Sequence, residues 1–544
     1  MSAKHSQKKR SGSRSDRLRI GLVLLLFLCL FGLVGKRLIK LQLVEGGKLS
    51  QLALQQYKRS DIRAPYRGTI YSRNGREFAA SVRLASVYMV PQETDHQRYH
   101  ELARLLDFKD DRLEKKKKSS KRFVWVKRKL TPRLADKVRK MKLPGIHVTD
   151  EQSRVYIDKT LAGQLVGFVG IDNQGLEGIE YLFNSQLKAE GQGIRLTIDR
   201  KIQQITEAAL YETCREHRPR SGMALVMEPF SGDVLALAVW PSYNPNRFGD
   251  YPAETWRNKI ICDRFEPGSI MKVFTAAAAL EERLYRPEDQ IFCHNGAYRL
   301  HKGVIRDTKP LGWISFAQVI EKSSNIGTMQ VAQDLGKKRL FHYLSRFGFG
   351  RKTGIRLPGE SPGKLRPLKE WSPRSLASIA FGQELSVTAL QFLTAFSCIV
   401  SDGVLVRPRI ILSQASSRKG IRVISGRTSR LMKKILVGVV ERGTGRKAGI
   451  AGYRVGGKTG TAQVFDSELG RYSPDKYVSS FVGFAPAEQP KITALVALNQ
   501  PAQGGYYGGL VAAPAFKRLA RETLAYLKVF PRKAAPIKMA AAGL

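Results

Sequence analysis

The sequence is poor in cysteine and contains only one long hydrophobic run. Its five cysteines in 544 residues form no Cys-x-x-Cys pair and no Cys/His cluster at metal-ligand spacing, so we expect no zinc site. Glycine and proline occur at ordinary frequencies, which excludes a collagen-like or low-complexity chain. A disulfide among the cysteines that follow the hydrophobic run stays open, because spacing assigns no pair. These are Cys214, Cys262, Cys293 and Cys398.

Acidic residues are also scarce, with 46 against 92 basic residues and a formal net charge of +46. Such an excess indicates the kind of partner rather than the fold, with nucleic acid first and an anionic surface second. The densest basic stretch covers residues 114–142. We interpret it as a solvent-facing loop and helix face rather than a dedicated binding patch, because runs of charge usually face solvent.

The hydrophobic run, IGLVLLLFLCLFGLVG at residues 20–35, carries no charge and is flanked by Arg19, Lys36 and Arg37. Flanking cations can extend a short run to the length of a membrane span. A cleaved signal peptide is disfavoured because no small-residue cleavage site follows. We predict a basic cytoplasmic tail at residues 1–19 and a single-pass anchor in the inner (cytoplasmic) membrane at 20–40. The rest of the chain would then be extracytoplasmic or periplasmic, which argues against nucleic acid as a partner.

Beyond the anchor, the apolar runs predict two folded domains. Residues 41–220 mix short strands and helices with basic loops, beginning with a helix at 41–58. Residues 221–530 start with a hairpin of strands 223–227 and 234–240, and blocks of helices and strands follow, which is typical of a mixed α/β domain. Further helices are predicted at 269–284, 316–335, 385–400, 429–441 and 512–527, strands at 461–465, 478–484 and 492–498, and a C-terminal tail at 531–544.

The most informative local pattern is Glu266-Pro-Gly-Ser269-Ile-Met-Lys272. Pro and Gly end the preceding segment, so Ser269 opens an apolar helix and Lys272 lies one turn later on the same face. A serine is a good nucleophile only when a base takes its proton, and a lysine kept neutral by burial can be that base. S-x-x-K also occurs elsewhere, for example at Ser361, and an N-cap serine on a core helix is the alternative interpretation.

A second pattern, Ser323-Ser-Asn325, lies inside the predicted helix at 316–335. Its hydroxyl could pass a proton, and its amide could hold a substrate carbonyl group. S-x-N is weak alone because it occurs twice more in the chain, and the alternative interpretation is a polar helix end.

A third pattern, Lys458-Thr459-Gly460-Thr461, leads into a predicted strand. The lysine and the hydroxyls could hold a carboxylate, and the glycine lets a ligand approach the strand backbone. Residues 452–459 also fit the phosphate-binding loop G-x-x-x-x-G-K-[ST], but that loop needs a following helix and the next residues predict a strand. A second Lys-Thr-Gly, at residues 352–354, runs into a Leu-Pro-Gly turn.

In this order, the three patterns resemble the class B penicillin-binding proteins. The resemblance covers about residues 58–527 and is carried by longer strings as well. One departure is Ser72, where the family usually has Asp. The strings are EPGSIMK, EKSSNIGT, FGQELSVTALQ (381–391), ERGTG (441–445), GGKTGTAQ, RGTIYSRNG (67–75) and GLEGIE (175–180).

The resemblance implies the fold and the activity. Residues 221–530 would form a penicillin-binding/β-lactamase-like transpeptidase domain with helices around a mainly antiparallel sheet. Residues 41–220 would form a non-catalytic α+β pedestal of the penicillin-binding protein dimerisation type. The activity implied is a serine D,D-transpeptidase that cross-links peptidoglycan stem peptides through an acyl-enzyme, is acylated by β-lactam antibiotics, and needs no metal or organic cofactor.

The resemblance also implies catalytic roles for four residues. Ser269 would attack the carbonyl carbon of a stem-peptide D-Ala-D-Ala, with Lys272 as its base. Ser323 and Lys458 would relay the proton to the leaving D-Ala.

Substrate binding is implied for the remaining patterned residues. Asn325 would bind the donor peptide, and Thr459 and Thr461, with Gly460 between them, would hold its terminal carboxylate. The backbone N–H groups of Ser269 and Thr461 would form the oxyanion hole.

The motif at residues 241–246 and the short leader resemble the division (FtsI-type) transpeptidases more than the elongation type. Partners implied are a SEDS-type glycosyltransferase and division proteins, with the pedestal as a docking surface. A β-lactamase is disfavoured by the lack of an E-x-x-L-N loop. The alternatives are an elongation-type class B transpeptidase and, less favoured, a β-lactam sensor, which should carry further spans, or a non-catalytic division scaffold. We interpret the positive charge as attraction to anionic envelope polymers, which predicts salt-sensitive binding to isolated sacculi.

Overall fold

The computed structural model describes residues 14–50, 66–94, 99–108, 116, 118, 120–121, 123–189, 191–301, 303–412, 420–466 and 470–531. The chain divides into two compact units, Met1–Pro65 and Tyr66–Leu544. Each unit is described by itself.

The described part of the first unit is a long apolar helix. Helix α1 covers Arg14–Ile39 and continues as the π-helical turn η1, Lys40–Val44. Residues Arg17–Val44 have a mean hydropathy of 2.5, and 28 helical residues extend about 42 Å, more than a bilayer core of about 30 Å requires. This helix contains the predicted anchor. Part of the helix predicted at 41–58, residues 51–58, lies outside the described residues. So does most of the cytoplasmic tail predicted at 1–19.

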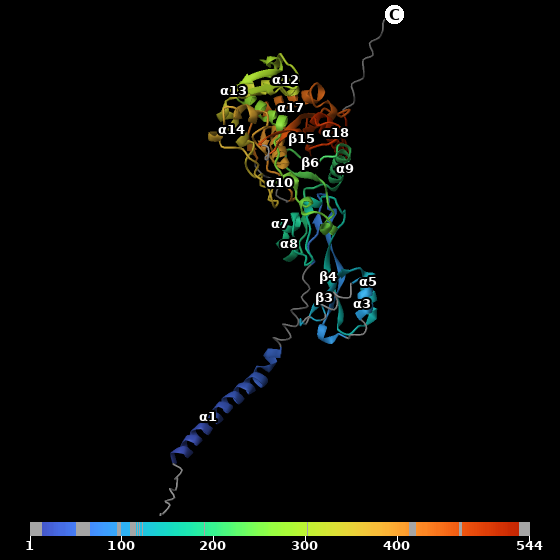
Figure 1. The fold of residues 1–544 in the computed structure, drawn as a ribbon, viewed down its shortest axis with the longest axis vertical. Helices are drawn as coiled ribbons and strands as arrows, with labels where there is room; N and C mark the ends of the chain where they lie inside the picture. Colours follow the sequence, from blue (N-terminus) through green and yellow to red (C-terminus); the bar gives the residue numbers. More distant parts are fainter. Residues whose placement is uncertain are drawn as a thin grey trace, which may run out of the picture. The chain divides into compact units, whose positions relative to one another are not determined.

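The second unit begins with a five-stranded sheet. Its order is β3-β2-β1-β5, and β4 pairs with β2 over the full length from Ala79–Tyr156 to Met89–Ile146. Helices α3 (Tyr99–Leu105) and α5 (Pro132–Met141) pack against it, as Figure 1 shows. The strands are β1 (Ile70–Tyr71), β2 (Glu77–Met89), β3 (Val124–Leu130), β4 (Ile146–Tyr156) and β5 (Ile194–Arg195).

Helix α5 lies in the basic stretch that we interpreted as solvent-facing. Ala135 and Val138 are buried, whereas the basic side chains of the helix are exposed, so the interpretation is confirmed for this helix. The exposed basic residues are Arg133, Lys137, Arg139 and Lys140.

Three short helices follow, α6 (Gly163–Val166), α7 (Gly178–Leu182) and α8 (Asn184–Ala189). Here the RGTIYSRNG and GLEGIE strings meet. The Glu180 carboxylate accepts from Arg67 Nε and from Arg154 Nε, both at 2.6 Å, and all three side chains are buried. Buried charges persist only when they are paired, so removing one partner of such a cluster is strongly destabilising.

A second, antiparallel five-stranded sheet is the centre of the remaining chain, with the order β14-β15-β16-β6-β7. Strands β6, β7 and β16 are almost entirely buried because both faces of the sheet are covered by helices. The predicted hairpin and the three predicted later strands are confirmed, as is the mainly antiparallel sheet. The strands are β6 (Ser221–Met227), β7 (Val234–Trp240), β14 (Gly456–Asp466), β15 (Arg471–Ala485) and β16 (Ile492–Asn499).

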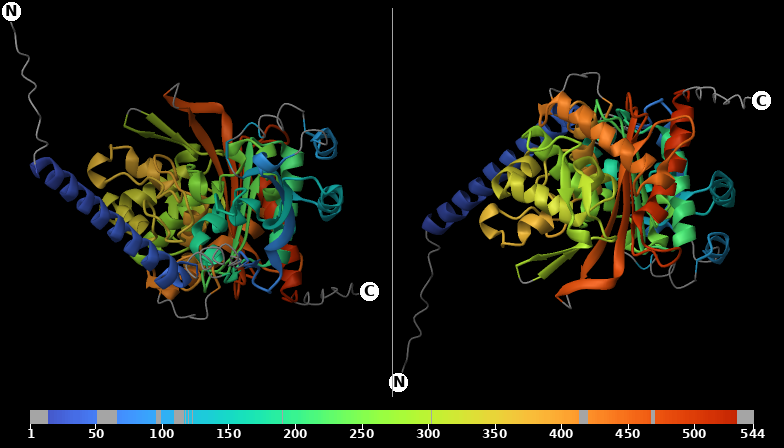
Figure 2. Two further views of the ribbon diagram at one scale, coloured as in Figure 1. Left: turned by 90° about the horizontal axis from the view of Figure 1, so that it is seen from below. Right: turned by 90° about the horizontal axis from the view of Figure 1, so that it is seen from above.

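Helices α9 (Arg200–His217) and α18 (Gly508–Tyr526) cover one face of this sheet, and α11 (Lys272–Glu281), α16 (Ala389–Val400) and α17 (Gly426–Glu441) lie on the other (Figure 2). Along β6, Leu225 packs toward the α16 side, while its neighbours Ala224 and Val226 pack toward α9 and α18. The predicted domain division at 220 falls just after α9.

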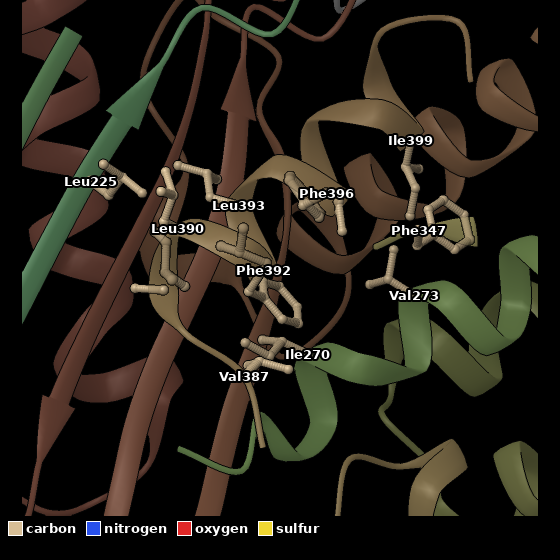
Figure 3. Packing of buried hydrophobic residues seen from close by; sticks show 14 of the residues in the cluster. Leu225, Ile270, Val273, Phe347, Val387, Leu390, Phe392, Leu393, Phe396 and Ile399 are labelled. Atoms are coloured by element: carbon tan, nitrogen blue, oxygen red, sulfur yellow. The ribbon is translucent and has the colours of Figure 1, made fainter. Parts of the chain in front are cut away.

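Helix α16 is buried on all sides, which explains why most of its residues are apolar. Figure 3 shows its residues Leu390, Phe392, Leu393 and Phe396 filling the space between Leu225 of β6 and the segment of Ile270 and Val273. The core of the domain therefore lies directly behind the helix that Ser269 precedes.

The helices predicted at 269–284, 429–441 and 512–527 differ from the structure by up to four residues at their ends, and two others contain a break or an extended segment. The helix predicted at 316–335 is two helices, α12 (Phe316–Glu321) and α13 (Asn325–Leu335). The helix predicted at 385–400 begins only at Ala389, because residues 385–388 are extended and Val387 pairs with Phe265. The other elements are α10 (Lys259–Cys262), α14 (Lys337–Arg346), α15 (Ser375–Ala380), and the two-stranded pairs β8 (Gln290–Phe292) with β11 (Trp313–Ser315), β9 (Ala297–Leu300) with β10 (Gly303–Arg306), and β12 (Val404–Leu405) with β13 (Ile421–Arg422).

Candidate active site

Ser269 lies in a short 3-10 segment, η5 (Gly268–Met271), that runs directly into α11. The segment is fixed by close backbone contact: the Gly268 N–H donates to the Gly382 carbonyl at 3.0 Å. Gly382 has a φ of +91°, and a Cβ atom there would lie 2.1 Å from the Gly268 carbonyl oxygen. Only glycine fits this position, which explains why the FGQ string accompanies the serine. Ser269 itself is half-buried, and its hydroxyl has no hydrogen-bond partner among the described residues.

Lys272 is completely buried, although lysine is almost never found so. Its Nζ donates to the Ser323 carbonyl at 2.6 Å and to Asn325 Oδ1 at 2.7 Å, and lies 3.3 Å from Ser323 Oγ. Burial lowers the pKa of Lys272 to about 7, and the negative charge of Asp307 partly opposes this effect. A substantial fraction of Lys272 is therefore neutral near pH 7.

Ser323 occupies the break between α12 and α13, where the continuous helix was predicted. Its φ of +63° is unusual for a residue with a side chain, and this turn places both its carbonyl and its hydroxyl next to lysine amines. Ser324 then caps α13 by accepting from the Gly327 N–H at 2.9 Å. The alternative interpretation of this pattern, a polar helix end, is therefore correct for Ser324, whereas Ser323 and Asn325 contact Lys272.

Lys458 approaches the same hydroxyl from the sheet. It is completely buried on β14, and its Nζ donates to Ser323 Oγ at 2.9 Å and to the Thr459 carbonyl at 3.0 Å. Burial, and then the nearby Lys272, hold its pKa well below the ordinary lysine value. The phosphate-loop alternative is wrong, because Lys458 and the residues after it continue as one strand instead of opening a helix.

Thr459 and Thr461 are two residues apart on β14 and share a face, opposite to Lys458 and Gly460. Thr459 Oγ1 lies 2.7 Å from Thr444 Oγ1, and Thr461 Oγ1 accepts from the Gly508 N–H at 3.0 Å.

Gly460 lets β14 lie against the nucleophile segment. A Cβ atom at position 460 would lie 3.1 Å from both the Pro267 carbonyl oxygen and the Ile270 side chain, and 2.4 Å from Ser480 Oγ. Since β14 is an edge strand of its sheet, an extended peptide could pair with its outer side next to Ser269.

Two acidic residues near the site were not predicted from the sequence. Asp307 precedes α13 and accepts from Ser324 Oγ at 2.6 Å, from the Ile326 N–H at 3.2 Å and from the Asn325 N–H. It thereby orients Asn325. No local signal in the sequence identifies it, because its partners are 17–19 residues away in an irregular segment.

Glu266 is the other unpredicted acid. Burial raises its pKa to about 7. Its carboxyl group accepts from Tyr472 Oη at 3.0 Å and from the Glu384 N–H at 3.1 Å, so it joins β15 and the FGQEL segment to the residues before Ser269.

The ERGTG string supports the site from behind. The Thr444 N–H donates to the Glu321 carbonyl at 3.2 Å, and Arg442 donates to Glu321 Oε1 at 2.6 Å. The string therefore joins the end of α12 to Thr459, through Thr444.

The cysteines give a simple result. All five are free in the structure, so the disulfide that the sequence left open is not formed. Cys293 lies beside the site, with its Sγ 3.4 Å from Ser324 Oγ.

The site therefore contains four of the predicted residues in one hydrogen-bonded cluster, Lys272, Ser323, Asn325 and Lys458, beside the strand that carries Thr459, Gly460 and Thr461. Ser269 is one helical turn from Lys272 but outside that cluster. Two amines with lowered pKa values around one hydroxyl can accept and donate protons, as acyl transfer by an activated serine requires.

Comparison with known proteins agrees with this chemistry. Residues 222–521 match the family model "Penicillin binding protein transpeptidase domain", and residues 62–225 match "Penicillin-binding Protein dimerisation domain". The chain is 33% identical to stage V sporulation protein D of Bacillus subtilis over 95% of this chain and 87% of that protein. It is 32% identical to the peptidoglycan D,D-transpeptidase FtsI of Escherichia coli, over 90% of this chain and 87% of that protein.

Among solved structures, penicillin-binding protein 3 of Mycobacterium tuberculosis, complexed with aztreonam, is similar, with a TM-score of 0.70 and 26% identity. The similarity covers 87% of this chain and 98% of that one. The transpeptidase model matches over half of the chain, and the relatives align along most of it. The chain belongs to the class B penicillin-binding proteins, the β-lactam-binding family of peptidoglycan D,D-transpeptidases.

Proposed function

We propose that the chain cross-links peptidoglycan through an acyl-enzyme formed on Ser269. The observation that carries this proposal is the completely buried Lys272, whose pKa is lowered to about 7 one turn after Ser269. A neutral amine at this place can take the Ser269 proton, and Oγ can then attack the carbonyl carbon of the penultimate D-Ala of a stem peptide.

Departure of the terminal D-Ala requires a proton on its nitrogen. The Ser323 hydroxyl, 2.9 Å from Lys458 Nζ and 3.3 Å from Lys272 Nζ, is placed to pass that proton from one amine to the leaving nitrogen. An amine from a neighbouring stem peptide then attacks the ester, loses its proton to the same relay, and releases Ser269. The exchange is balanced: one peptide bond breaks and one forms.

The remaining patterned residues fit substrate binding. We assign Asn325 to the donor peptide, Thr459 and Thr461 to its terminal carboxylate, and Gly460 to the close approach of the donor along the β14 edge. Backbone N–H groups of Ser269 and Thr461 form the oxyanion hole in this proposal. Its support is the short separation of η5 and β14 at Gly460, where no side chain stands between them.

The location follows from the charge around the apolar helix. We propose that α1 anchors the chain in the inner membrane, with the basic N-terminal residues in the cytoplasm and the unit from Tyr66 onward outside. Fusion of a periplasm-active reporter to the C-terminus tests this orientation, since an inward-facing C-terminus would leave the reporter inactive.

A division role is the finer proposal. The relative of E. coli carries the division-type name FtsI, and the chain matches it over 90% of its length. We propose septal cross-linking in company with a SEDS-type glycosyltransferase, docked on the region before β6. Depletion of the protein should produce filamentous cells, and in undepleted cells a labelled fusion protein should lie at mid-cell. Rounded cells and lateral labelling would assign the elongation role instead.

The decisive experiment for the activity is labelling with a fluorescent penicillin, followed by mass spectrometry of the labelled peptide. We expect a stable adduct on Ser269 in the wild type and none in Ser269→Ala. Ser361→Ala is a matched control, because it removes a serine from another S-x-x-K pattern and should label normally. Labelling that survives in Ser269→Ala would refute the assignment, and rapid release of the label with nitrocefin turnover would indicate a β-lactamase.

A further inference from the structure

A cavity of about 770 Å³ lies away from the serine site, and the proposed reaction does not use it. It is bordered by the end of α14, the loop at 351–356, α16 and the segment around Arg407. The second Lys-Thr-Gly of the sequence, Lys352-Thr353-Gly354, is part of its wall. None of the patterned residues assigned to the serine site lines it.

The wall is strongly cationic. Five basic side chains from three separate segments line the cavity, and no acidic side chain does so within the part of the chain that the structure describes. These five, here called the cationic cavity residues, are Arg346, Arg351, Lys352, Arg356 and Arg407.

None of these five makes an ion pair with a carboxylate among the described residues. The nearby Glu360 is buried and directed to Thr353, accepting from its N–H and its hydroxyl at 2.6 Å each. All five are exposed to solvent, and their grouped like charges make a positive field that would attract an anion into the cavity.

The cavity wall is also fixed by buried polar groups. The Gln391 amide, 2% exposed, donates to the carbonyl oxygens of Gly348, Arg351 and Pro362 at 3.1, 2.7 and 2.9 Å, which holds two of the bordering segments together. Thr394 also lines the cavity, but its hydroxyl oxygen is itself buried and has no hydrogen-bond partner among the described residues.

We propose that this cavity binds a ligand with several phosphate groups, at a site separate from the transpeptidase centre. Its volume is that of an ordinary small-ligand pocket and far exceeds the size of one carboxylate. Guanidinium groups form paired hydrogen bonds with phosphate oxygens, and several converging arginines suit a group with several charged oxygens. Free oligophosphate and a phosphodiester polymer of the envelope share this chemistry.

The test uses the full chain in a neutral detergent at fixed ionic strength, with inorganic tripolyphosphate as the calorimetric probe. The variant Arg351→Ala/Lys352→Ala/Arg407→Ala should bind at least about tenfold more weakly than wild type, since charge-assisted hydrogen bonds are lost. A matched control removes three exposed cations from α9 and α18, on the opposite face of the sheet: Lys201→Ala/Lys517→Ala/Arg521→Ala. It should bind like wild type.

Each other outcome is informative. Equal weakening in the control would show general charge attraction, and absence of wild-type binding would show that no such site exists; either overturns the proposal. Citrate binding as tightly as tripolyphosphate would overturn the phosphate assignment. A poly(glycerol phosphate) chain that binds more tightly than tripolyphosphate would identify the polymer as the source, and the reverse order would identify free oligophosphate.

A measurement on the wild type alone guards against a misfolded variant. Phenylglyoxal modifies accessible arginines, and peptide mass spectrometry locates them. Tripolyphosphate should protect Arg351 and Arg407 and leave Arg521 reactive. Unchanged reactivity of Arg351 and Arg407 at saturating probe would overturn the proposal. Penicillin labelling of Ser269 in the same samples reports separately on the proposed activity.

Discussion

The dependence of acylation on pH tests the serine site most directly. With a pKa of about 7, Lys272 is about half neutral at pH 7, whereas a lysine with the ordinary value of 10.5 would be about one part in three thousand neutral. Because only the neutral amine can accept the Ser269 proton, the rate constant of acylation should fall about tenfold for each pH unit below about 6. Above about pH 8 it should be nearly constant.

The assay is the second-order rate constant for labelling by a fluorescent penicillin between pH 5 and 9, at constant ionic strength and corrected for hydrolysis of the reagent. Thermal unfolding at each pH controls for loss of the folded protein. A rate that still rises tenfold per unit beyond pH 8.5 would mean that Lys272 is an ordinary lysine. A rate independent of pH would mean that Lys272 is not the base.

Asp307 provides an internal check with a defined sign. Burial lowers the pKa of Lys272, and the Asp307 charge partly raises it. In Asp307→Asn the amide oxygen can still accept from the Asn325 N–H, but the charge is gone, so the pKa of Lys272 should fall further. The rising part of the pH profile should move to lower pH while the plateau is kept. Movement to higher pH, or none, would contradict the electrostatic role of Asp307.

Three substitutions test the packing around the site. Gly460→Ala should slow acylation at least about tenfold and lower the unfolding free energy by about 1–3 kcal/mol, because the new Cβ atom would meet the Pro267 carbonyl and Ile270. Labelling at the wild-type rate would contradict the close packing of β14. Phe396→Ala, in the completely buried α16, should cost about 3–5 kcal/mol in denaturant unfolding, and a loss under 1 kcal/mol would be inconsistent with that burial. Lys272→Met should abolish labelling yet stabilise the fold by about 1–3 kcal/mol at pH 7, because the buried amine is removed. A lower melting temperature with normal circular dichroism would contradict the idea that burying this amine destabilises the fold.

Much of the fold could be predicted from the sequence because its apolar runs are long and well separated. The β6–β7 hairpin, α11 and α18 follow from such runs. The errors in the helices predicted at 316–335 and 385–400 occurred where a short irregular segment interrupts an apolar run. Residues 385–388 alternate apolar and polar residues, which is the pattern of an extended segment, and they pair with the strand-like stretch at Phe265.

The candidate site could be predicted in its residues but not in its geometry. Three short patterns, each weak alone, indicated Lys272, Ser323 and Lys458 once the family resemblance joined them, and the structure brings both lysines to the Ser323 hydroxyl. That Ser323 breaks a helix with a φ of +63° could not be predicted, because the conformation is imposed by contacts with distant segments. Asp307 and Tyr472 contribute through the same kind of long-range contact, for which one sequence contains no signal.

Burying the two lysines of the site lowers the stability of the folded protein. Lowering the pKa of Lys272 from 10.5 to about 7 costs about 4–5 kcal/mol of folding free energy at neutral pH, relative to an unfolded chain in which the amine is protonated. Between pH 7 and 10.5 the unfolded state binds the extra proton, so this cost shrinks as pH rises through that range. Lys458 adds a cost of the same sign, because its pKa is also lowered by burial and by Lys272. The cost is comparable with the whole stability of many domains, so burial of apolar residues in the core, including those of the fully buried α16, must offset it. The lowered pKa of Lys272, the proposed base, is therefore maintained by burial in the core, at the expense of stability, rather than by any single contact at the site.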